Sequence, residues 1–138
     1  MIKNKIMFKW LKFFQKKNTE IKESRFPLVV VGKVLEVLNH PQADRLHITK
    51  VDVGSEILTI VCGAPNVAAG QLVAVAKIGA QLTPDFVIAP VNLRGEMSYG
   101  MLCSAKELGL GEDHDGIMVL DENRNIALGQ SLDKYLAN

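Results

Sequence analysis

The sequence predicts an all-β fold for residues 26–138, a closed or nearly closed β-barrel with added short strands and short helices. From Leu28 onward, apolar residues recur with the period of strands, and Gly, Pro and Asn residues separate the segments at regular intervals. The longest segment contains Gly32, and a glycine inside a long strand often marks the bend that lets a sheet curl. With 48% hydrophobic residues, a chain of 138 residues can form one domain core.

A basic amphipathic helix is predicted at residues 1–17, ahead of the β domain. Lysines recur at steps of four, three and four residues on one helical face, namely Lys5, Lys9, Lys12 and Lys16. Apolar side chains recur on another face at steps of four, four and three residues, namely Ile2, Ile6, Trp10 and Phe13. Such a helix can pack on the domain or on a second copy, touch RNA phosphates or lie on an anionic membrane, and its periodicity leaves these roles open. With the polar linker that follows, it forms the segment 1–25.

The strands of the barrel are predicted from alternation and from the turns between them. Leu28–Leu38 is the first, and Gly32 is expected to bulge or bend it. Leu46–Val53 changes phase between Ile48 and Val51, which predicts a second bulge. The other predicted strands are Ile57–Cys62, Leu72–Ile78, Phe86–Ile88, Val91–Leu93, Tyr99–Cys103 and Ile117–Leu120.

Two short helices complete the predicted fold. Ser104 and Glu107 stand at the spacing of a capping box, and Gly109 can end the helix that they begin. Ser131–Leu136 is expected to form one or two final helical turns that pack on the barrel.

Charge is divided unevenly along the chain, although its overall value is only +1. Residues 1–25 contain eight basic and two acidic residues, a net charge of +6. The remainder contains eight basic and thirteen acidic residues, a net charge of −5. A nucleic-acid site on the β domain must therefore be a local basic cluster on an acidic body.

The two cysteines, Cys62 and Cys103, both stand in apolar segments and are predicted to be buried rather than paired or metal-bound. The spacing of His40, His47 and His114 does not supply a metal site either. No apolar run approaches the roughly 20 residues that span a bilayer, and no signal-peptide cleavage site is evident near the N-terminus. These features predict a cytoplasmic protein without a metal.

Several motifs that suggest catalysis or ligand binding are incomplete. Gly109 and Gly111 begin a dinucleotide fingerprint, but its third glycine position is His114. The acidic residues of the segment 111–122 partly match a calcium loop, but its first ligand position is Gly111. No serine or cysteine stands at a recognisable spacing from a base. The sequence therefore predicts no catalytic residue and no cofactor.

Aromatic residues are few in the β domain, which contains only Phe26, Phe86, Tyr99 and Tyr135. An extended platform for stacking unpaired bases needs more of them. Recognition of a folded RNA by its shape, through phosphate and 2′-hydroxyl contacts, does not.

A family resemblance is carried by a series of sequence blocks that follow one another along the chain from residue 30 to residue 117. They are Val30–Gly32, His40–Leu46, Lys50–Gly54, Ile60–Asn66, Leu93–Gly95, Ser98, Gly100–Ser104, Glu107–Gly109 and Asp113–Ile117. With these blocks the chain resembles the tRNA-binding OB-fold domain near the N-terminus of bacterial phenylalanyl-tRNA synthetase β subunits. The family also includes free-standing tRNA-binding proteins, appendages of methionyl-tRNA synthetase and a chaperone-like group.

The resemblance implies a five-stranded OB-fold barrel and a tRNA contact surface around the turn at Asn92–Gly95 and the strand that follows it. Arg94 can hold a phosphate with two hydrogen bonds, and Gly95 lets the backbone come close. Other cations and polar groups nearby complete the expected site. The predicted tRNA-binding residues are Lys33, Arg45, Lys50, Lys77, Asn92, Arg94, Ser98, Ser104 and Lys106.

The expected function is that of a non-catalytic module that recognises folded tRNA by shape and phosphate contacts. The chain ends at Asn138, before the large remainder of a β subunit, so it resembles a free-standing relative or a fragment. The alternatives are an accessory component of phenylalanyl-tRNA synthetase and a chaperone-like peptide-binding module. The expected partners are tRNA, an aminoacyl-tRNA synthetase and a second copy of the chain, with membrane contact through the N-terminal helix left open.

Overall fold

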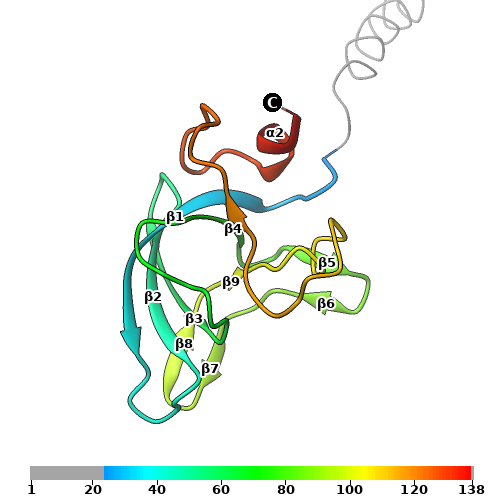
Figure 1. Ribbon diagram of the computed structural model, residues 1–138. Coiled ribbons are helices and arrows are strands. Elements are labelled where there is room, and N and C mark those ends of the chain that lie inside the picture. The colour runs from blue at the N-terminus through cyan, green and yellow to red at the C-terminus, as the bar shows by residue number, and fades with distance from the viewer. Residues whose placement is uncertain (1–23, 138) are drawn as a thin grey trace, which may run out of the picture.

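The computed structural model describes residues 24–137, so the helix predicted at residues 1–17 lies outside the described residues. One strongly curved antiparallel sheet forms most of the molecule, and two small hairpins extend from it (Figure 1). The strands of the sheet are β1 (Val29–Asn39), β2 (His47–Asp52), β3 (Ile57–Cys62), β4 (Leu72–Ala76), β9 (Met101–Leu102) and β10 (Val119–Leu120). The hairpins are formed by β5 (Gln81–Thr83) with β6 (Phe86–Val87) and by β7 (Val91–Leu93) with β8 (Glu96–Ser98). The helix of the described range is α2 (Leu132–Ala137).

The sheet has the order β10-β4-β1-β2-β3, and β9 pairs with β4 outside this path. Because β1 is long, one half of it pairs with β4 and the other half with β2. The inward side chains of these strands fill the core; the fully buried ones include Val31, Val34, Val51, Ile60 and Val73. The prediction of an all-β fold is confirmed.

Strand pairing does not close the sheet into a complete barrel within residues 24–137, because β3 remains an edge strand. The end of β8 and the residue that follows it nevertheless lie against this edge. The Tyr99 N–H donates to the Thr59 carbonyl oxygen at 2.8 Å, and the Val61 N–H donates to Ser98 Oγ at 3.0 Å. A serine hydroxyl thus takes the place of a ladder carbonyl at the point where closure would need one.

The bulge of the sheet lies elsewhere than the sequence predicts. The register between β1 and β2 shifts at Leu35, between Val34 and Glu36, and not at Gly32. Gly32 instead lets two side chains approach, because a Cβ there would lie 2.8 Å from Val75 Cγ2. The second bulge, predicted in Leu46–Val53, is wrong, since β2 and β3 pair in uninterrupted register.

Thr49 explains why the second bulge was expected. Its side chain, and not that of Ile48, points into the core, where it is fully buried. The Thr49 hydroxyl donates to the Ile60 carbonyl oxygen at 2.7 Å, so its burial leaves no unpaired donor. An inward polar residue therefore breaks the apolar alternation without breaking the strand.

The helix predicted at Ser104 is a series of hydrogen-bonded turns instead. The capping box is present, because the Glu107 N–H donates to Ser104 Oγ at 3.2 Å and the Ser104 N–H donates to Glu107 Oε1 at 2.8 Å. Only a short run of turns follows, since the Gly109 N–H already bonds back to the Lys106 carbonyl oxygen at 3.0 Å. The final helix is confirmed as α2, which Ser131 caps through its hydroxyl.

Asp133 in α2 holds the beginning of the described chain. Its carboxylate accepts hydrogen bonds from Ser24 Oγ and from the N–H groups of Arg25 and Phe26, at 2.8, 2.8 and 3.3 Å. Burial raises the pKa of Asp133, but these hydrogen bonds together lower it by more than burial raises it. The pKa therefore lies below its ordinary value. The segment through which residues 1–23 join the domain is therefore fixed to α2 by a charged acceptor.

Replacing Asp133 by Asn is expected to lower the free energy of unfolding at neutral pH by about 0.5–1 kcal/mol, because water screens this partly exposed carboxylate. A carboxylate with a lowered pKa stabilises the folded state above the ordinary pKa of aspartate, and this stabilisation disappears as the pH falls through the lowered value. The difference in stability between the wild-type chain and the Asp133→Asn variant should therefore shrink in acid. Urea unfolding at pH 7 and pH 3 measures it, and an equal difference at both values would contradict the assignment.

Both cysteines are free and buried, as predicted. Burial, and secondly the charge of Glu107, raise the pKa of the Cys103 thiol to about 12. No helix within residues 24–137 combines the length and the apolar character that crossing a membrane would require.

Candidate nucleic-acid interface

The turn of the β7–β8 hairpin presents Arg94 on a constrained backbone. Leu93 pairs with Glu96, so Arg94 and Gly95 form a two-residue loop. Both have positive φ values, 54° and 95°, as a type I′ turn requires. Gly95 adopts this conformation freely, whereas Arg94 needs support from its surroundings. Asn92 supplies part of it, because Asn92 Oδ1 accepts a hydrogen bond from the Gly95 N–H at 2.8 Å.

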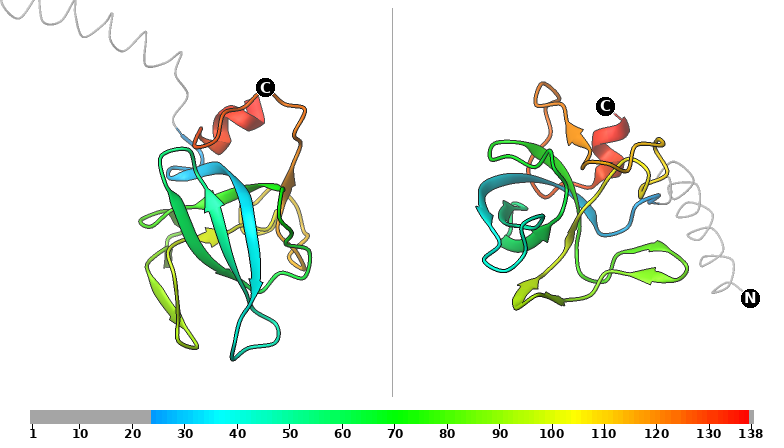
Figure 2. Two further views of the ribbon diagram at one scale, coloured as in Figure 1. Left: turned by 90° about the vertical axis from the view of Figure 1, so that its left-hand side faces the viewer. Right: turned by 60° about the horizontal axis from the view of Figure 1, so that its bottom comes forward.

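The loop between β1 and β2, residues 40–46, lies beside this turn. Its two ends are joined because the His40 N–H donates to the Leu46 carbonyl oxygen at 3.1 Å. The loop exposes Gln42, Asp44 and Arg45. We call residues 40–46 and Asn92–Gly95 together the loop–hairpin surface. Figures 1 and 2 show both parts at the same end of the molecule, opposite α2.

His40 connects the two parts of the loop–hairpin surface. Its imidazole is buried, with Nε2 lying 2.8 Å from the Leu93 carbonyl oxygen and Nδ1 accepting a hydrogen bond from the Gln42 N–H at 3.0 Å. Arg94 adds a third link, because its Nη1 donates to the Gln42 carbonyl oxygen at 3.3 Å. Two segments 53 residues apart in sequence are thereby fixed to each other.

The Arg94 guanidinium remains available to a ligand. Its side chain is exposed, and among the described residues it has no ion pair with a carboxylate. Of five guanidinium N–H donors, the bond to Gln42 uses one, so a phosphate can still be held by two parallel hydrogen bonds.

The predicted lysines of the sheet lie near acidic groups. Lys33 stands opposite Asp52 in the β1–β2 register, and Lys50 stands opposite Glu36. Lys50 also donates to Thr59 Oγ1 at 2.6 Å, while Lys77 Nζ lies 3.9 Å from Glu56 Oε2. The outer face of β1, β2 and β3 therefore mixes charges of both signs rather than forming a basic patch.

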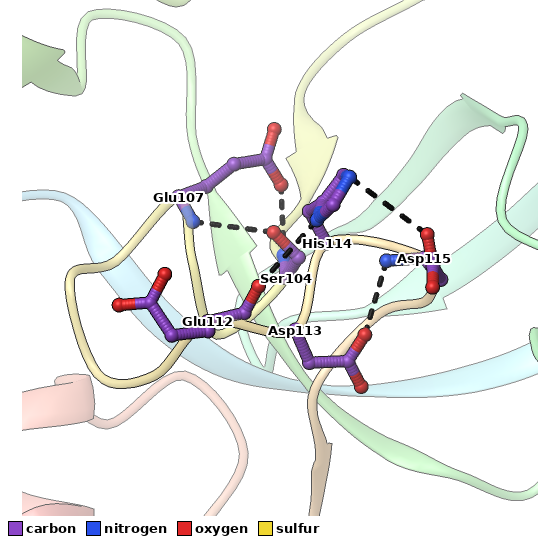
Figure 3. A network of polar contacts seen from close by, with 6 residues as sticks. All are labelled: Ser104, Glu107, Glu112, Asp113, His114 and Asp115. Atoms are coloured by element: carbon purple, nitrogen blue, oxygen red, sulfur yellow. Dashed lines mark hydrogen bonds and ion pairs between the residues drawn. The ribbon is translucent and has the colours of Figure 1, made fainter.

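The two predicted serines are buried and already hydrogen-bonded. Ser98 Oγ accepts from the Val61 N–H and donates to the Gly100 carbonyl oxygen at 3.1 Å, which uses its proton. Ser104 caps the turns that follow it, in the polar network of Figure 3, where Glu107 and the acidic segment 112–115 lie close by. Lys106 is exposed nearby and lines a groove with Arg25 and Phe26.

The structure therefore brings together three of the predicted site residues, Asn92 and Arg94 in the turn and Arg45 in the adjacent loop. The other six, Lys33, Lys50, Lys77, Ser98, Ser104 and Lys106, lie outside the loop–hairpin surface. The sequence analysis did not select His40, although His40 begins one of the blocks that carry the family resemblance. A histidine directly after a strand and before a proline was the available signal.

The net charge of the described domain does not by itself favour binding of a polyanion. Residues 24–137 contain nine basic and thirteen acidic residues, a net charge of −4. Within this range no group of three His, Cys, Asp or Glu side chains is arranged to hold a metal ion. The available chemistry is hydrogen bonding from an exposed guanidinium and from backbone and amide groups beside it.

Small β domains that bind oligonucleotides use connecting loops of a curved antiparallel sheet as part of their contact surface. Comparison with known families agrees, because the family described as "Putative tRNA binding domain" matches residues 29–130. The chain belongs to this tRNA-binding domain family, as the sequence analysis predicted.

Similar proteins include two bacterial phenylalanine–tRNA ligase β subunits. The protein of Chlorobaculum tepidum is 52% identical over 134 residues, which cover 92% of this chain and 16% of the relative. That of Nitratidesulfovibrio vulgaris is 59% identical over 99 residues, which cover 71% of this chain and 12% of the relative. The chain thus spans only a small part of the length of these relatives.

Two solved structures have a similar fold. The C-terminal domain of Plasmodium vivax p43 is 26% identical with a TM-score of 0.54, and the match covers 76% of this chain and 58% of that one. The MetRS-related protein of Pyrococcus horikoshii, at 21% identity and a TM-score of 0.55, matches 77% of this chain and 88% of that one. At this identity the second likeness concerns the fold alone.

Proposed function

We propose that this chain is a non-catalytic tRNA-binding module that recognises folded tRNA through its loop–hairpin surface. The observation that carries the proposal is the exposed Arg94 guanidinium, held on a constrained turn with four N–H donors left for a phosphate. Asn92 and Arg45 lie on the same surface and can add phosphate or 2′-hydroxyl contacts.

The proposed architecture is a five-stranded OB-fold barrel, in which the loop between the first two strands and that between the last two frame the nucleic-acid site. In this proposal the loop at residues 40–46 and the β7–β8 hairpin take these two positions. The hydrogen bond between Tyr99 and Thr59 and the one between Val61 and Ser98 support closure at the β3 edge.

Residues 1–25 are proposed to supply the general attraction to tRNA, and residues 26–138 the shaped surface. This division follows from charge, since the first segment has a net charge of +6 and the second −5. Self-association through the first segment, or its contact with a membrane, would give it another role. In the cell we place the protein in the cytoplasm, where tRNA is found.

A filter-binding titration with bulk tRNA tests the proposal. The full chain is expected to bind at low salt, with an affinity that falls steeply toward physiological salt because each neutralised phosphate releases counterions. A chain of residues 26–138 should bind more weakly and with a shallower salt slope. Absence of binding by the full chain at low salt would refute the proposed function, whereas equal slopes would refute the role of residues 1–25.

The tRNA role is proposed to serve phenylalanine–tRNA ligation, either as part of a longer β subunit or beside one. High identity to two such β subunits supports this setting, although the chain spans 16% and 12% of their lengths. The chain itself is assigned no catalytic step, since its polar groups on the loop–hairpin surface are suited to binding and not to proton or group transfer.

Peptide binding is the second candidate function, and one observation favours it. A pocket of about 340 Å³ beside the hairpins is lined mainly by apolar side chains, among them Phe86, Val87 and Val91, which are all exposed. Isolation of the chain with and without ribonuclease separates the candidates, because a peptide-binding module would keep its partners after the RNA has been removed.

A further inference from the structure

We infer that His40 is a positioning residue for tRNA binding, which sets the Arg94 turn in place from the neighbouring loop. This inference rests on the proposed function and identifies how its main contact is held. It starts from the fact that both hydrogen bonds of the imidazole go to backbone groups of the loop–hairpin surface. With His40 only 5% exposed, the ring belongs to the support of that surface and not to its contact face.

The two hydrogen bonds define the state of the ring. A backbone N–H can only donate, so His40 Nδ1 must be an unprotonated acceptor for Gln42. Nε2 then bears the ring hydrogen and donates it to the Leu93 carbonyl oxygen. A neutral imidazole in this one tautomer satisfies both segments at once, and no aliphatic side chain of similar size could do so.

His40 is linked to Arg94 by two routes, one through Leu93 and the other through Gln42. On one side, the Leu93 carbonyl that accepts from His40 belongs to the peptide unit that leads into Arg94. On the other, the peptide of Gln42 donates to His40, and the Gln42 carbonyl accepts from Arg94 Nη1. His40, Gln42, Arg94 and Leu93 therefore form a closed circuit of hydrogen bonds, in which the backbone and the guanidinium of Arg94 are both held.

Fixing the turn in this way should increase affinity without adding a contact. Arg94 has φ 54°, a conformation that residues other than glycine adopt reluctantly. Without His40 the turn can relax, and binding must then order it again at an entropic cost. The effect of His40 on affinity should accordingly pass through Arg94.

A double-mutant cycle on the full chain tests this, with bulk tRNA as the probe and filter binding as the measurement. His40→Ala is expected to weaken binding by between about twofold and tenfold, the cost of ordering one long side chain and its turn. In the Arg94→Ala background the same change should have no further effect. His40→Gln should recover part of the affinity, because the Gln amide can still donate to the Leu93 carbonyl oxygen.

Asn66→Ala serves as the matched structural control. Asn66 also joins two distant segments through backbone groups, since it accepts from the Ile117 N–H at 2.9 Å and donates to the Ile117 carbonyl oxygen at 3.0 Å. It lies outside the loop–hairpin surface. Its replacement and His40→Ala should both lower the midpoint of thermal unfolding, but Asn66→Ala should leave tRNA affinity unchanged at temperatures where both variants are folded.

The outcomes are distinguishable. Unchanged affinity in His40→Ala, losses that add in the double variant, or an equal loss in Asn66→Ala would each overturn the role of His40, and the proposed function would stand. An Arg94→Ala variant that binds like the wild type would overturn it as well, because His40 is argued to act through Arg94. A wild-type chain that does not bind tRNA at low salt would refute the proposed function itself.

Discussion

Replacing Gly129 by Ala is expected to destabilise the domain by about 3 kcal/mol or more and to lower its Tm by about 10 °C. Gly129 has φ 87°, and a Cβ built on it would overlap the Val53 carbonyl oxygen. The overlap is with backbone, so no side-chain rotation can relieve it. Gly54 faces it in the same manner, because a Cβ there would overlap the Leu128 carbonyl oxygen.

The cost is large because the close approach of these glycines fixes the C-terminal segment on β1. The Gly129 N–H donates to the Val31 carbonyl oxygen at 2.7 Å, and the Val31 N–H donates to the Gln130 carbonyl oxygen at 2.8 Å. A Cβ at residue 129 must push this segment away from the β2–β3 turn and loosen both bonds, each worth about 1 kcal/mol. Strain from the positive φ adds about 1–2 kcal/mol.

Gly70→Ala is the matched control for this prediction. Gly70 has φ 93°, but a Cβ there would meet nothing within 4 Å. The substitution should therefore destabilise the domain only through the backbone strain of the positive φ. Urea unfolding of the two variants separates strain from overlap. Equal losses of free energy in the two variants would show that the backbone approach at Gly129 contributes nothing.

The strands could be predicted closely where alternation was the dominant signal. Ile57–Cys62 and Val91–Leu93 have their predicted bounds, since each is framed by clear turn residues. β5 and β8 were missed because Gln81–Thr83 and Glu96–Ser98 are short hairpin arms without an apolar period. The bulge expected in Leu46–Val53 is absent for a different reason, since Thr49 takes a core position and its hydroxyl is satisfied there by a hydrogen bond. The bulge at Leu35 leaves no trace in composition.

The candidate site could be predicted only in part. Arg94, Asn92 and Gly95 were recognisable as a turn, and the structure confirms a two-residue hairpin loop. The role of His40 depends on contacts 53 residues apart, which a single sequence does not reveal. Ser98 was chosen as a polar residue of the motif, but whether its hydroxyl is free depends on the neighbouring strand, which brings the Val61 N–H against it.

Replacing Arg94 by Glu is expected to weaken tRNA binding by about thirtyfold to a hundredfold near physiological salt, without unfolding the domain. A hydrogen bond to a charged group contributes about 1.5–3 kcal/mol, and the new carboxylate also repels the phosphate. The slope of log K against log salt should become shallower by about 0.9, the contribution of one phosphate. Stability should change little, because the Arg94 side chain is exposed and makes one internal hydrogen bond at 3.3 Å.

Lys134→Glu separates this local effect from the general charge of the chain. Lys134 is exposed on α2, at the end of the molecule opposite the loop–hairpin surface, and the substitution changes the net charge by the same two units. Because charges separated by more than the Debye length of about 8 Å are largely screened at physiological salt, Lys134→Glu should change affinity by less than about threefold. If both variants lose affinity equally, long-range attraction governs binding, and Arg94 would have no special place in it. If only Arg94→Glu loses affinity, the acidic domain binds tRNA through one local surface, and its net charge of −4 over residues 24–137 is no obstacle to that function.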